Sequence, residues 1–269
     1  MPKVFVTVDE IVENPRFVDT RFSMQNVHEG KALYEQGHIH GAIYWDLEKD
    51  LSDMSSTNGR HPMPSKEQLQ TLFENSGLHD DDFIYVYDQG GAPFAARAWY
   101  LLTYAGFSNV WIVNGGFPTL KDEFPVTISE VEYERTSLTL VWQEQLYASR
   151  QDVKRVVDGL EQATLLDART AVRYRGEKEP LDPVAGHIPT AKNFDWEQLK
   201  VGKELQPNDN LRSKVQKDEQ IIVYCGSGVT ASPLYAALTH DGYTDLRLYM
   251  GSYSDWITVY DVATGDENL

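Results

Sequence analysis

The stretch IIVYCGSGVTA, residues 221–231, decides the fold of this chain. Its first four residues form a short apolar, β-branched run, which is typical of a buried strand in a parallel sheet. The segment ASPLYAAL at residues 231–238 indicates that a helix follows. Cys225 therefore lies in a strand-to-helix turn, where backbone N–H groups and the positive end of the helix dipole would stabilise a thiolate.

Cys225 is the only cysteine among 269 residues, so the chain cannot form an internal disulfide. A lone cysteine is also a poor start for a structural zinc site, and we expect neither a metal nor a cofactor. Two interpretations of the thiol stay open at this point. It is either a small buried hydrophobic residue or a reactive nucleophile.

Composition narrows the class of protein. Hydrophobic residues make up 41% of the chain, which supplies enough apolar surface for a globular core. The formal net charge of -17 would repel phosphate backbones and anionic lipids, so we expect neither nucleic acid nor a membrane as a partner. No apolar leader or membrane-length apolar run is present, and we expect a cytoplasmic protein.

Parts of the sequence occur twice in the same order. FVDTR at residues 17–21 returns as LLDAR at residues 165–169, and GHIHGA at residues 37–42 returns as GHIPTA at residues 186–191. Two matches at nearly the same spacing indicate a tandem of two similar domains.

Each copy alternates buried strands with helical stretches. This pattern predicts an α/β fold of two tandem domains, each with a mainly parallel sheet flanked by helices on both faces. The first copy holds an additional Ser/Asn/Gly/Pro-rich loop at residues 51–64. We place a non-catalytic domain at residues 1–125, a linker at residues 126–147 and a catalytic domain at residues 148–269.

The two copies differ at the cysteine. Aligning FIYVY at residues 83–87 with IIVY at residues 221–224 places Asp88 opposite Cys225. Only the second copy has a nucleophile. The first copy either forms a wall of the cleft or only adds buried area, and the sequence leaves both interpretations open.

These motifs together resemble the tandem rhodanese family of sulfurtransferases. The resemblance covers nearly the whole chain, including GRHP at residues 59–62, the Cys225 loop and GSYSDW at residues 251–256. It implies two rhodanese-like domains and a cysteine that attacks the donor sulfur, becomes a persulfide and passes the sulfur on. Because the chain has no second cysteine, the acceptor would be a small thiol, thioredoxin or cyanide.

The loop also suggests the donor. CGSGVT at residues 225–230 is similar to the loop of the family branch that uses 3-mercaptopyruvate. Thiosulfate enzymes more often have basic residues after the cysteine, whereas Gly226 and Ser227 are uncharged. We therefore expect 3-mercaptopyruvate as donor, with thiosulfate:cyanide sulfur transfer as the alternative.

The resemblance implies three catalytic residues. Cys225 would be the nucleophile, Ser227 would hydrogen-bond the thiolate or relay a proton to the leaving enolate, and Glu48 would be linked to that serine. Ser227 could instead merely cap the turn. Glu48 lies within DLEKD at residues 46–50, which also fits an ordinary solvated charge run.

The resemblance places donor-binding residues in both copies. Arg173 would hold the donor carboxylate, because a guanidinium group binds that anion bidentately. The neighbouring Arg175 is expected in a surface ion pair, and the mercaptopyruvate branch has a second arginine where this chain reads EPLDP at residues 179–183. His61 would help line the donor pocket. The predicted loop contacts to the donor are Gly226, Gly228, Val229 and Thr230.

Two glycines of the loop have a physical reason of their own. Gly226 and Gly228 are expected to make the tight loop possible, because glycine tolerates positive φ and lets the backbone approach the sulfur. His38 and His187 occur in both copies and are expected to belong to the scaffold. The same expectation holds for the Asp-x-Arg pairs, Asp19, Arg21, Asp167 and Arg169.

Two other functions fit parts of this sequence. A cysteine phosphatase of the dual-specificity type needs an arginine six positions after its cysteine, and Ala231 occupies that position here. Phosphatase activity is therefore not expected. A non-catalytic sulfur-relay or regulatory binding module stays open as a remote alternative.

Overall fold

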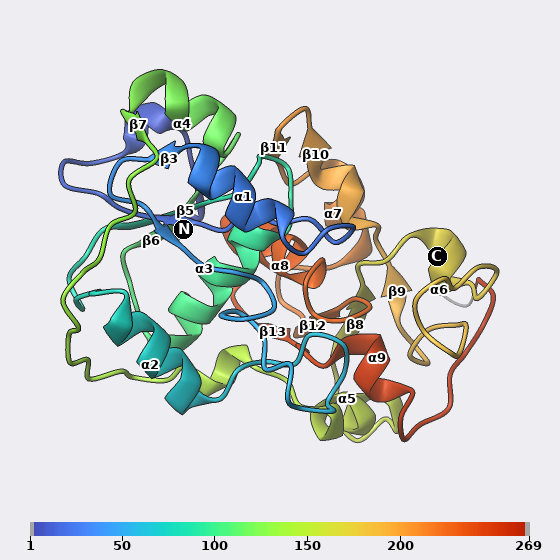
Figure 1. Cartoon of the computed structure of the whole chain (residues 1–269). Helices are drawn as coiled ribbons and strands as arrows, with labels where there is room; N and C mark the ends of the chain where they lie inside the picture. The colour runs from blue at the N-terminus through green and yellow to red at the C-terminus, as the bar shows by residue number, and fades with distance from the viewer. Residues whose placement is uncertain (1–2, 267–269) are drawn as a thin grey trace.

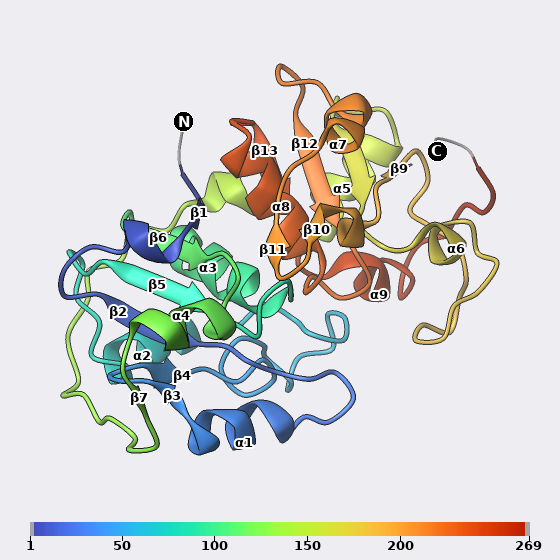
Figure 2. The same ribbon diagram turned by 90° about the horizontal axis from the view of Figure 1, so that it is seen from above.

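A computed structural model describes residues 3–266 of the chain. It contains two parallel sheets, one in each half of the sequence (Figure 1). Figure 2 shows the blue-to-green half and the yellow-to-red half lying side by side. The predicted tandem of two α/β units is confirmed.

The N-terminal sheet has five strands, and every neighbouring pair in it is parallel. The strands stand in the order β1 (Phe5–Val6), β6 (Val110–Val113), β5 (Ile84–Tyr87), β2 (Arg16–Asp19) and β4 (Ile43–Tyr44).

The C-terminal sheet repeats this order without the first strand. Its parallel strands are β13 (Leu246–Leu248), β12 (Ile221–Tyr224), β8 (Thr164–Asp167) and β9 (Lys192–Asn193). Tyr224 stands opposite Asp167 in this sheet, as Tyr87 stands opposite Asp19 in the other. The repeat seen in the sequence is thus a repeat of strand order and register.

Helices cover both faces of the N-terminal sheet. Successive side chains of a strand point to opposite faces. Ile84 and Val86 of β5 therefore join the core under α2 (Lys66–Asn75) and α3 (Phe94–Ala105), which cover one face. Tyr85 and Tyr87 join a smaller core with Leu120 on the other face. The remaining helices of this half are α1 (Glu29–Gln36) and α4 (Phe117–Glu123), which carries Leu120.

The C-terminal sheet is covered in the same way. Ile221 and Val223 of β12 pack with α7 (Asp209–Lys214) and α8 (Ala231–His240). Ile222 and Tyr224 face a second core. That core includes residues of α5 (Arg150–Val157), α6 (Ala171–Tyr174) and α9 (Ser252–Trp256). Across residues 3–266, no helix is both long enough and apolar enough to cross a membrane.

The connecting segments hold several short elements. β3 (His38–Ile39) pairs antiparallel with β7 (Val126–Thr127), and β10 (Lys200–Val201) pairs antiparallel with β11 (Glu204–Leu205). Three turns of 3₁₀-helix are η1 (Val8–Glu10), η2 (Glu144–Leu146) and η3 (Trp196–Leu199).

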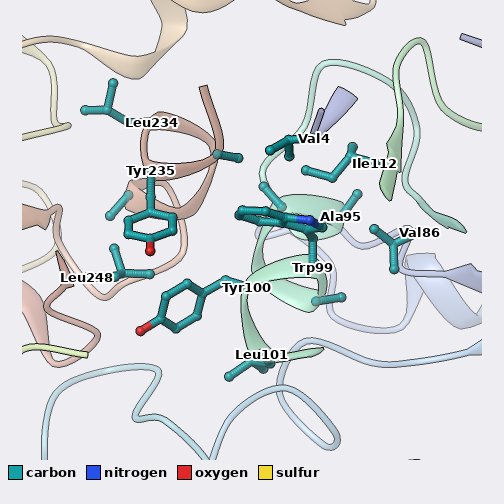
Figure 3. Packing of buried hydrophobic residues seen from close by; sticks show 14 of the residues in the cluster. Val4, Val86, Ala95, Trp99, Tyr100, Leu101, Ile112, Leu234, Tyr235 and Leu248 are labelled. Carbon is teal, nitrogen blue, oxygen red and sulfur yellow. The ribbon is translucent and has the colours of Figure 1, made fainter. Parts of the chain in front are cut away.

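The two halves share one hydrophobic core. Residues of α3 and α8, the helices that follow β5 and β12, pack against each other and belong to the same buried cluster. Tyr100 of α3 meets Tyr235 of α8 edge-on, with ring centroids 5.2 Å apart, and Trp99 lies 6.2 Å from the same ring. Figure 3 shows these rings at the contact between the halves. Burial of such rings is strongly stabilising, so this contact holds the two halves together.

The residues expected to form the scaffold make matching contacts in both copies. Arg21 pairs with Asp19 and donates to Gly37 O at 2.8 Å, and Arg169 pairs with Asp167 and donates to Gly186 O at 2.7 Å. His38 Nδ1 lies 2.8 Å from Tyr34 O, and His187 Nδ1 lies 2.8 Å from Tyr174 O. Contacts that recur in the copy without a thiol fit a structural role.

Candidate active site

Cys225 lies immediately after β12, and the loop that it begins contacts His61 and Arg60 of the first half. Its side chain is buried, and its Sγ accepts a hydrogen bond of 3.2 Å from Gly228 N–H. Ser252 Oγ accepts from Cys225 N–H at 3.1 Å and lies 4.0 Å from Sγ. Ser252 has a φ of 56°, which is uncommon for a residue other than glycine.

The two loop glycines are needed for different reasons. Gly228 has a φ of 77°, and a Cβ atom there would lie 2.3 Å from Met250 O. Gly226 is not among the described glycines with positive φ. A Cβ atom on it would instead lie 2.7 Å from Arg60 Nη2 and 3.2 Å from Arg173 Nη2. Gly226 is thus required for space and not for a left-handed backbone.

The predicted loop contacts are only partly brought to the sulfur. Within residues 3–266, the single hydrogen bond from a loop N–H to Sγ comes from Gly228. Val229 is buried, and its carbonyl accepts from Ser232 N–H at 3.2 Å. Thr230 is the N-cap of α8, without a side-chain capping bond. The ring of several donors expected around the thiol is therefore reduced to one.

Ser227, His61 and Glu48 form a line that crosses between the halves. His61 Nδ1 lies 3.0 Å from Ser227 Oγ, and His61 Nε2 lies 4.0 Å from Glu48 Oε1. Ser227 comes from the cysteine loop, whereas the other two come from the first copy. The structure thus brings His61 into contact with the serine and places Glu48 near the histidine, beyond hydrogen-bonding distance, and it favours the first copy as a wall of the site.

The His61 ring is held in its neutral form. Burial, together with the smaller effect of the positive charges of Arg97 and Arg60, lowers the pKa of His61 to about 4. A neutral imidazole has one donor and one acceptor nitrogen. With the proton on Nε2, facing Glu48, Nδ1 can accept the hydroxyl proton of Ser227.

Arg97 supports the loop that carries His61, and sequence reasoning missed it. The side chain is completely buried in α3; its Nε donates to Leu51 O at 2.9 Å and its Nη2 to His61 O at 2.9 Å. Burial lowers the pKa of Arg97 to about 10, while the nearby Cys225 acts in the opposite direction. The signal in the sequence was a single charge in the apolar helical segment FAARAWYLLTYA, residues 94–105.

Arg173 lies beside the thiol loop, as predicted, but in an ionic network. Its Nε and Nη2 donate to both carboxylate oxygens of Glu179 at distances from 2.8 to 3.1 Å. Its Nη2 also donates to Asp182 at 3.2 Å, and Asp182 forms an ion pair with Arg60. Arg60 was not predicted as a site residue, although GRHP was part of the resemblance. Arg175 pairs at the surface with Glu177, as expected.

Asp88 occupies the turn of the first copy that corresponds to the cysteine loop. Its carboxylate accepts hydrogen bonds from Gly90 N–H at 2.8 Å and Ala95 N–H at 3.1 Å. Burial raises its pKa to about 6. The Asp88 carboxylate therefore binds the backbone N–H groups of its own turn.

Comparison with known proteins shows to which family this architecture belongs. The family model of the rhodanese-like domain matches the chain twice, at residues 7–123 and 149–258. This protein belongs to the rhodanese family. A probable 3-mercaptopyruvate sulfurtransferase of Pseudomonas aeruginosa is 35% identical over 270 aligned positions, which cover 93% of this chain and 92% of the relative.

Two further matches agree with this placement. A putative thiosulfate sulfurtransferase of Mycobacterium tuberculosis is 35% identical, with 85% of this chain and 83% of the relative covered. The solved 3-mercaptopyruvate sulfurtransferase of Leishmania major superposes with a TM-score of 0.84 at 26% identity, covering 96% of this chain and 75% of that one. The chain is a tandem-domain rhodanese similar to 3-mercaptopyruvate sulfurtransferases, and it is a sulfurtransferase.

Proposed function

We propose that this rhodanese transfers a sulfane sulfur from 3-mercaptopyruvate, through a persulfide on Cys225, to a small thiol, thioredoxin or cyanide. The observation that carries the proposal is the contact of Ser227 with a buried, neutral His61 beside the only cysteine of the chain. A donor whose leaving group is an enolate needs a proton, and this pair can deliver one.

The first half-reaction needs an exchange of two bonds. The Cys225 thiolate attacks the donor sulfur, an S–S bond forms and the donor C–S bond breaks. The electron pair of the broken bond goes to the departing pyruvate enolate. The proton of the donor thiol reaches the enolate carbon through Ser227 and His61, so that the products are pyruvate and the Cys225 persulfide anion.

The second half-reaction returns the enzyme to its starting state. An acceptor thiolate attacks the outer persulfide sulfur, the S–S bond breaks and its electron pair returns to Cys225 as a thiolate. With cyanide the same step yields thiocyanate. Gly228 N–H lies within hydrogen-bonding distance of Sγ and would stabilise negative charge on the sulfur in both half-reactions.

The remaining proposed roles follow from position. Arg173, with Gly226 beside it, would face the donor carboxylate, whereas Val229 and Thr230 would only shape the start of α8. Glu48 would orient the His61 ring from the solvent side. We further propose the division of the chain at residues 125 and 148, with residues 126–147 as linker.

Thiosulfate:cyanide transfer is the second candidate. It is supported by two guanidinium groups, those of Arg60 and Arg173, which stand over the thiol loop and could accept a sulfonate. A thiosulfate donor releases sulfite and needs no proton for an enolate. With this donor, Ser227 and His61 would have no proton to transfer. That difference favours mercaptopyruvate.

The test is persulfide formation on a single thiol. The protein is incubated separately with 3-mercaptopyruvate and with thiosulfate, and the intact mass is measured for one added sulfur atom. We expect rapid addition from mercaptopyruvate with one pyruvate released, and no addition to Cys225→Ser. Faster addition from thiosulfate would favour the second candidate, and addition from neither donor, with sulfur accepted only from a persulfide, would favour a relay module.

A further inference from the structure

A cavity of about 480 Å³ lies between the two halves of the molecule. Small-molecule sites usually have a volume of roughly 300–1,000 Å³. The walls come from α3 and β6 of the first half and from α8 and β13 of the second. The main side chains that line this space, which we call the interface cavity, are Trp99, Phe107, Trp111, Tyr235, Tyr243 and Leu246.

The interface cavity lies away from the thiol. Leu246, which lines it, is the first residue of β13 and stands opposite Ile221, the first residue of β12. The two strands are parallel, and Cys225 follows the last residue of β12. The cavity and the thiol therefore belong to opposite edges of the C-terminal sheet, and the proposed sulfur transfer does not use the cavity.

Tyr235 brings an unused hydrogen-bond donor to this space. It is only 3% exposed, and within residues 3–266 its hydroxyl has no hydrogen-bond partner. The oxygen is not completely enclosed by protein, so it faces open space, and the interface cavity is the space that Tyr235 borders. Burial raises the pKa of Tyr235, so the hydroxyl keeps its proton. A buried donor without an acceptor is costly, and a ligand with an acceptor would remove that cost.

The two other buried polar side chains of the wall already have partners. The indole N–H of Trp99 donates to Val110 O at 3.2 Å. The hydroxyl of Tyr243 donates to Val215 O at 3.3 Å. Among the described residues that line the cavity, Tyr235 is thus the one buried side chain with a polar group left for a ligand.

The walls favour a flat, uncharged molecule. Of the described residues that line the cavity, only Lys3 carries a charge, and it forms an ion pair with Glu10. Figure 3 shows Trp99 and Tyr235 on the two facing helices, and their ring centroids are 6.2 Å apart. Aromatic walls bind a ring through offset or edge contacts. A charged ligand would lose its hydration here without gaining a charged partner.

The N-terminal strand completes the wall and is fixed by the other half. Val4 lines the cavity, and the N–H groups of Val4 and Phe5 donate to His240 Nδ1 at 3.2 and 3.3 Å. The rings of Phe5 and His240 also lie 5.3 Å apart. Burial lowers the pKa of His240, which favours the neutral ring that can accept these bonds. The cavity is therefore formed before any ligand binds.

We propose that the interface cavity binds a small, uncharged aromatic molecule that carries a hydrogen-bond acceptor for the Tyr235 hydroxyl. Such a molecule would contact both halves of the chain. It would stabilise the folded pair, because it binds a space that exists only when the halves are packed together. This site goes beyond the proposed function, since its residues take no part in sulfur transfer.

The test uses two probes of the same shape with the full chain. Acetophenone carries a carbonyl oxygen where α-methylstyrene carries a methylene group, so only acetophenone can accept a hydrogen bond from Tyr235. The dissociation constant of each probe is measured by saturation-transfer NMR titration. We expect both probes to bind, and acetophenone to bind about tenfold more tightly, which is the effect of one hydrogen bond in a buried site.

Three variants locate the probes. Tyr235→Phe keeps the ring and removes the hydroxyl, so it should weaken acetophenone alone and abolish the preference. Tyr243→Phe is the matched control, because Tyr243 lines the same cavity but its hydroxyl already donates to Val215 O. The preference should survive in this control. Thr103→Phe places a larger side chain into the cavity from α3 and should weaken both probes.

Alkylation of Cys225 with iodoacetamide separates this site from the active site. It should leave both dissociation constants unchanged, because the thiol lies at the opposite edge of the sheet. Loss of binding on alkylation, or unchanged affinity in Thr103→Phe, would place the probes elsewhere and overturn the inference. A preference for acetophenone that persisted in Tyr235→Phe would overturn it as well. If neither probe bound at millimolar concentration, the cavity would hold only water and the inference would be wrong.

Discussion

Lowering the pH should destabilise this protein through His61 by a predictable amount. The pKa of His61 falls from 6.5 in the unfolded chain to about 4 in the folded protein, because burial and two arginines disfavour the charged ring. Between these values the unfolded chain binds a proton that the folded protein does not. The contribution of His61 to the free energy of unfolding is therefore fully present above pH 6.5 and is lost as the pH falls toward 4.

The size of the effect follows from the same values. At pH 5 the solution lies 1.5 pH units below the pKa of the unfolded chain and still above that of the folded protein. At 1.36 kcal/mol per unit, His61 should lower the free energy of unfolding by about 2 kcal/mol between pH 7 and pH 5. The same shift keeps His61 neutral across this range, so the acid limb of mercaptopyruvate turnover should not have a midpoint near 6.5.

Urea denaturation at pH 7 and pH 5 measures this loss. Other groups titrate in the same interval, including Asp88, whose pKa burial raises to about 6, so the comparison is made with a variant. His61→Asn keeps a polar group near Ser227 without the ionisation, and it should lack about 2 kcal/mol of the loss seen in the natural protein. His79→Asn, a change of an exposed histidine, is the matched control.

The result that refutes this reasoning is an equal loss in the natural protein and in His61→Asn. It would mean that the ring takes up its proton without cost in the folded state, and that it is not held neutral beside Ser227. A loss that disappeared equally in His79→Asn would point to a general change in surface charge.

Three further predictions concern the residues around the thiol. Ser227→Ala should slow pyruvate release by about 100-fold, because proton transfer typically contributes that much, while persulfide formation from thiosulfate changes far less. Arg97→Met should lower the free energy of unfolding by about 3 kcal/mol in urea, because it leaves the buried Leu51 and His61 carbonyls without a donor; intact stability would contradict that role. Gly228→Ala should cost more stability than Gly159→Ala, which has a similar positive φ of 71° but open space around it. Equal costs in these two thermal unfolding experiments would show that backbone strain alone matters.

The fold could be predicted because its determinants are local and repeated. Each four-residue strand is a short apolar run between glycine-containing or polar turns. The repeated Asp-x-Arg and Gly-His-Ile segments show which residues of the two copies correspond. Tyr87 with Asp19 and Tyr224 with Asp167 stand at equivalent registers, which a single alignment of the halves anticipates.

The site could be predicted only where one segment carries the chemistry. Cys225 and Ser227 lie in one loop, so their proximity follows from the sequence. Arg60 lies in the first copy and reaches the loop from the other half of the chain, and Arg97 is connected to the loop only through His61. Nothing local to either arginine shows this.

Gly226 shows a second limit. Sequence identifies a glycine but not whether its backbone angle or its missing side chain is needed. Here the guanidinium groups of Arg60 and Arg173 fill the space that a Cβ atom would take. The distinction requires the coordinates of residues that are distant in the sequence, on the loop of the first copy and on α6.

The shared core between α3 and α8 has a consequence for how such a chain can be divided. Separating residues 148–269 from the rest would expose Tyr235 and the apolar face of α8, and would remove the histidine and arginine that the first copy supplies. The half is therefore the repeated unit of structure, whereas the buried cluster between α3 and α8 and the site both need the pair. Recombining halves from different relatives should succeed only when the two facing helices are exchanged together as a matched set.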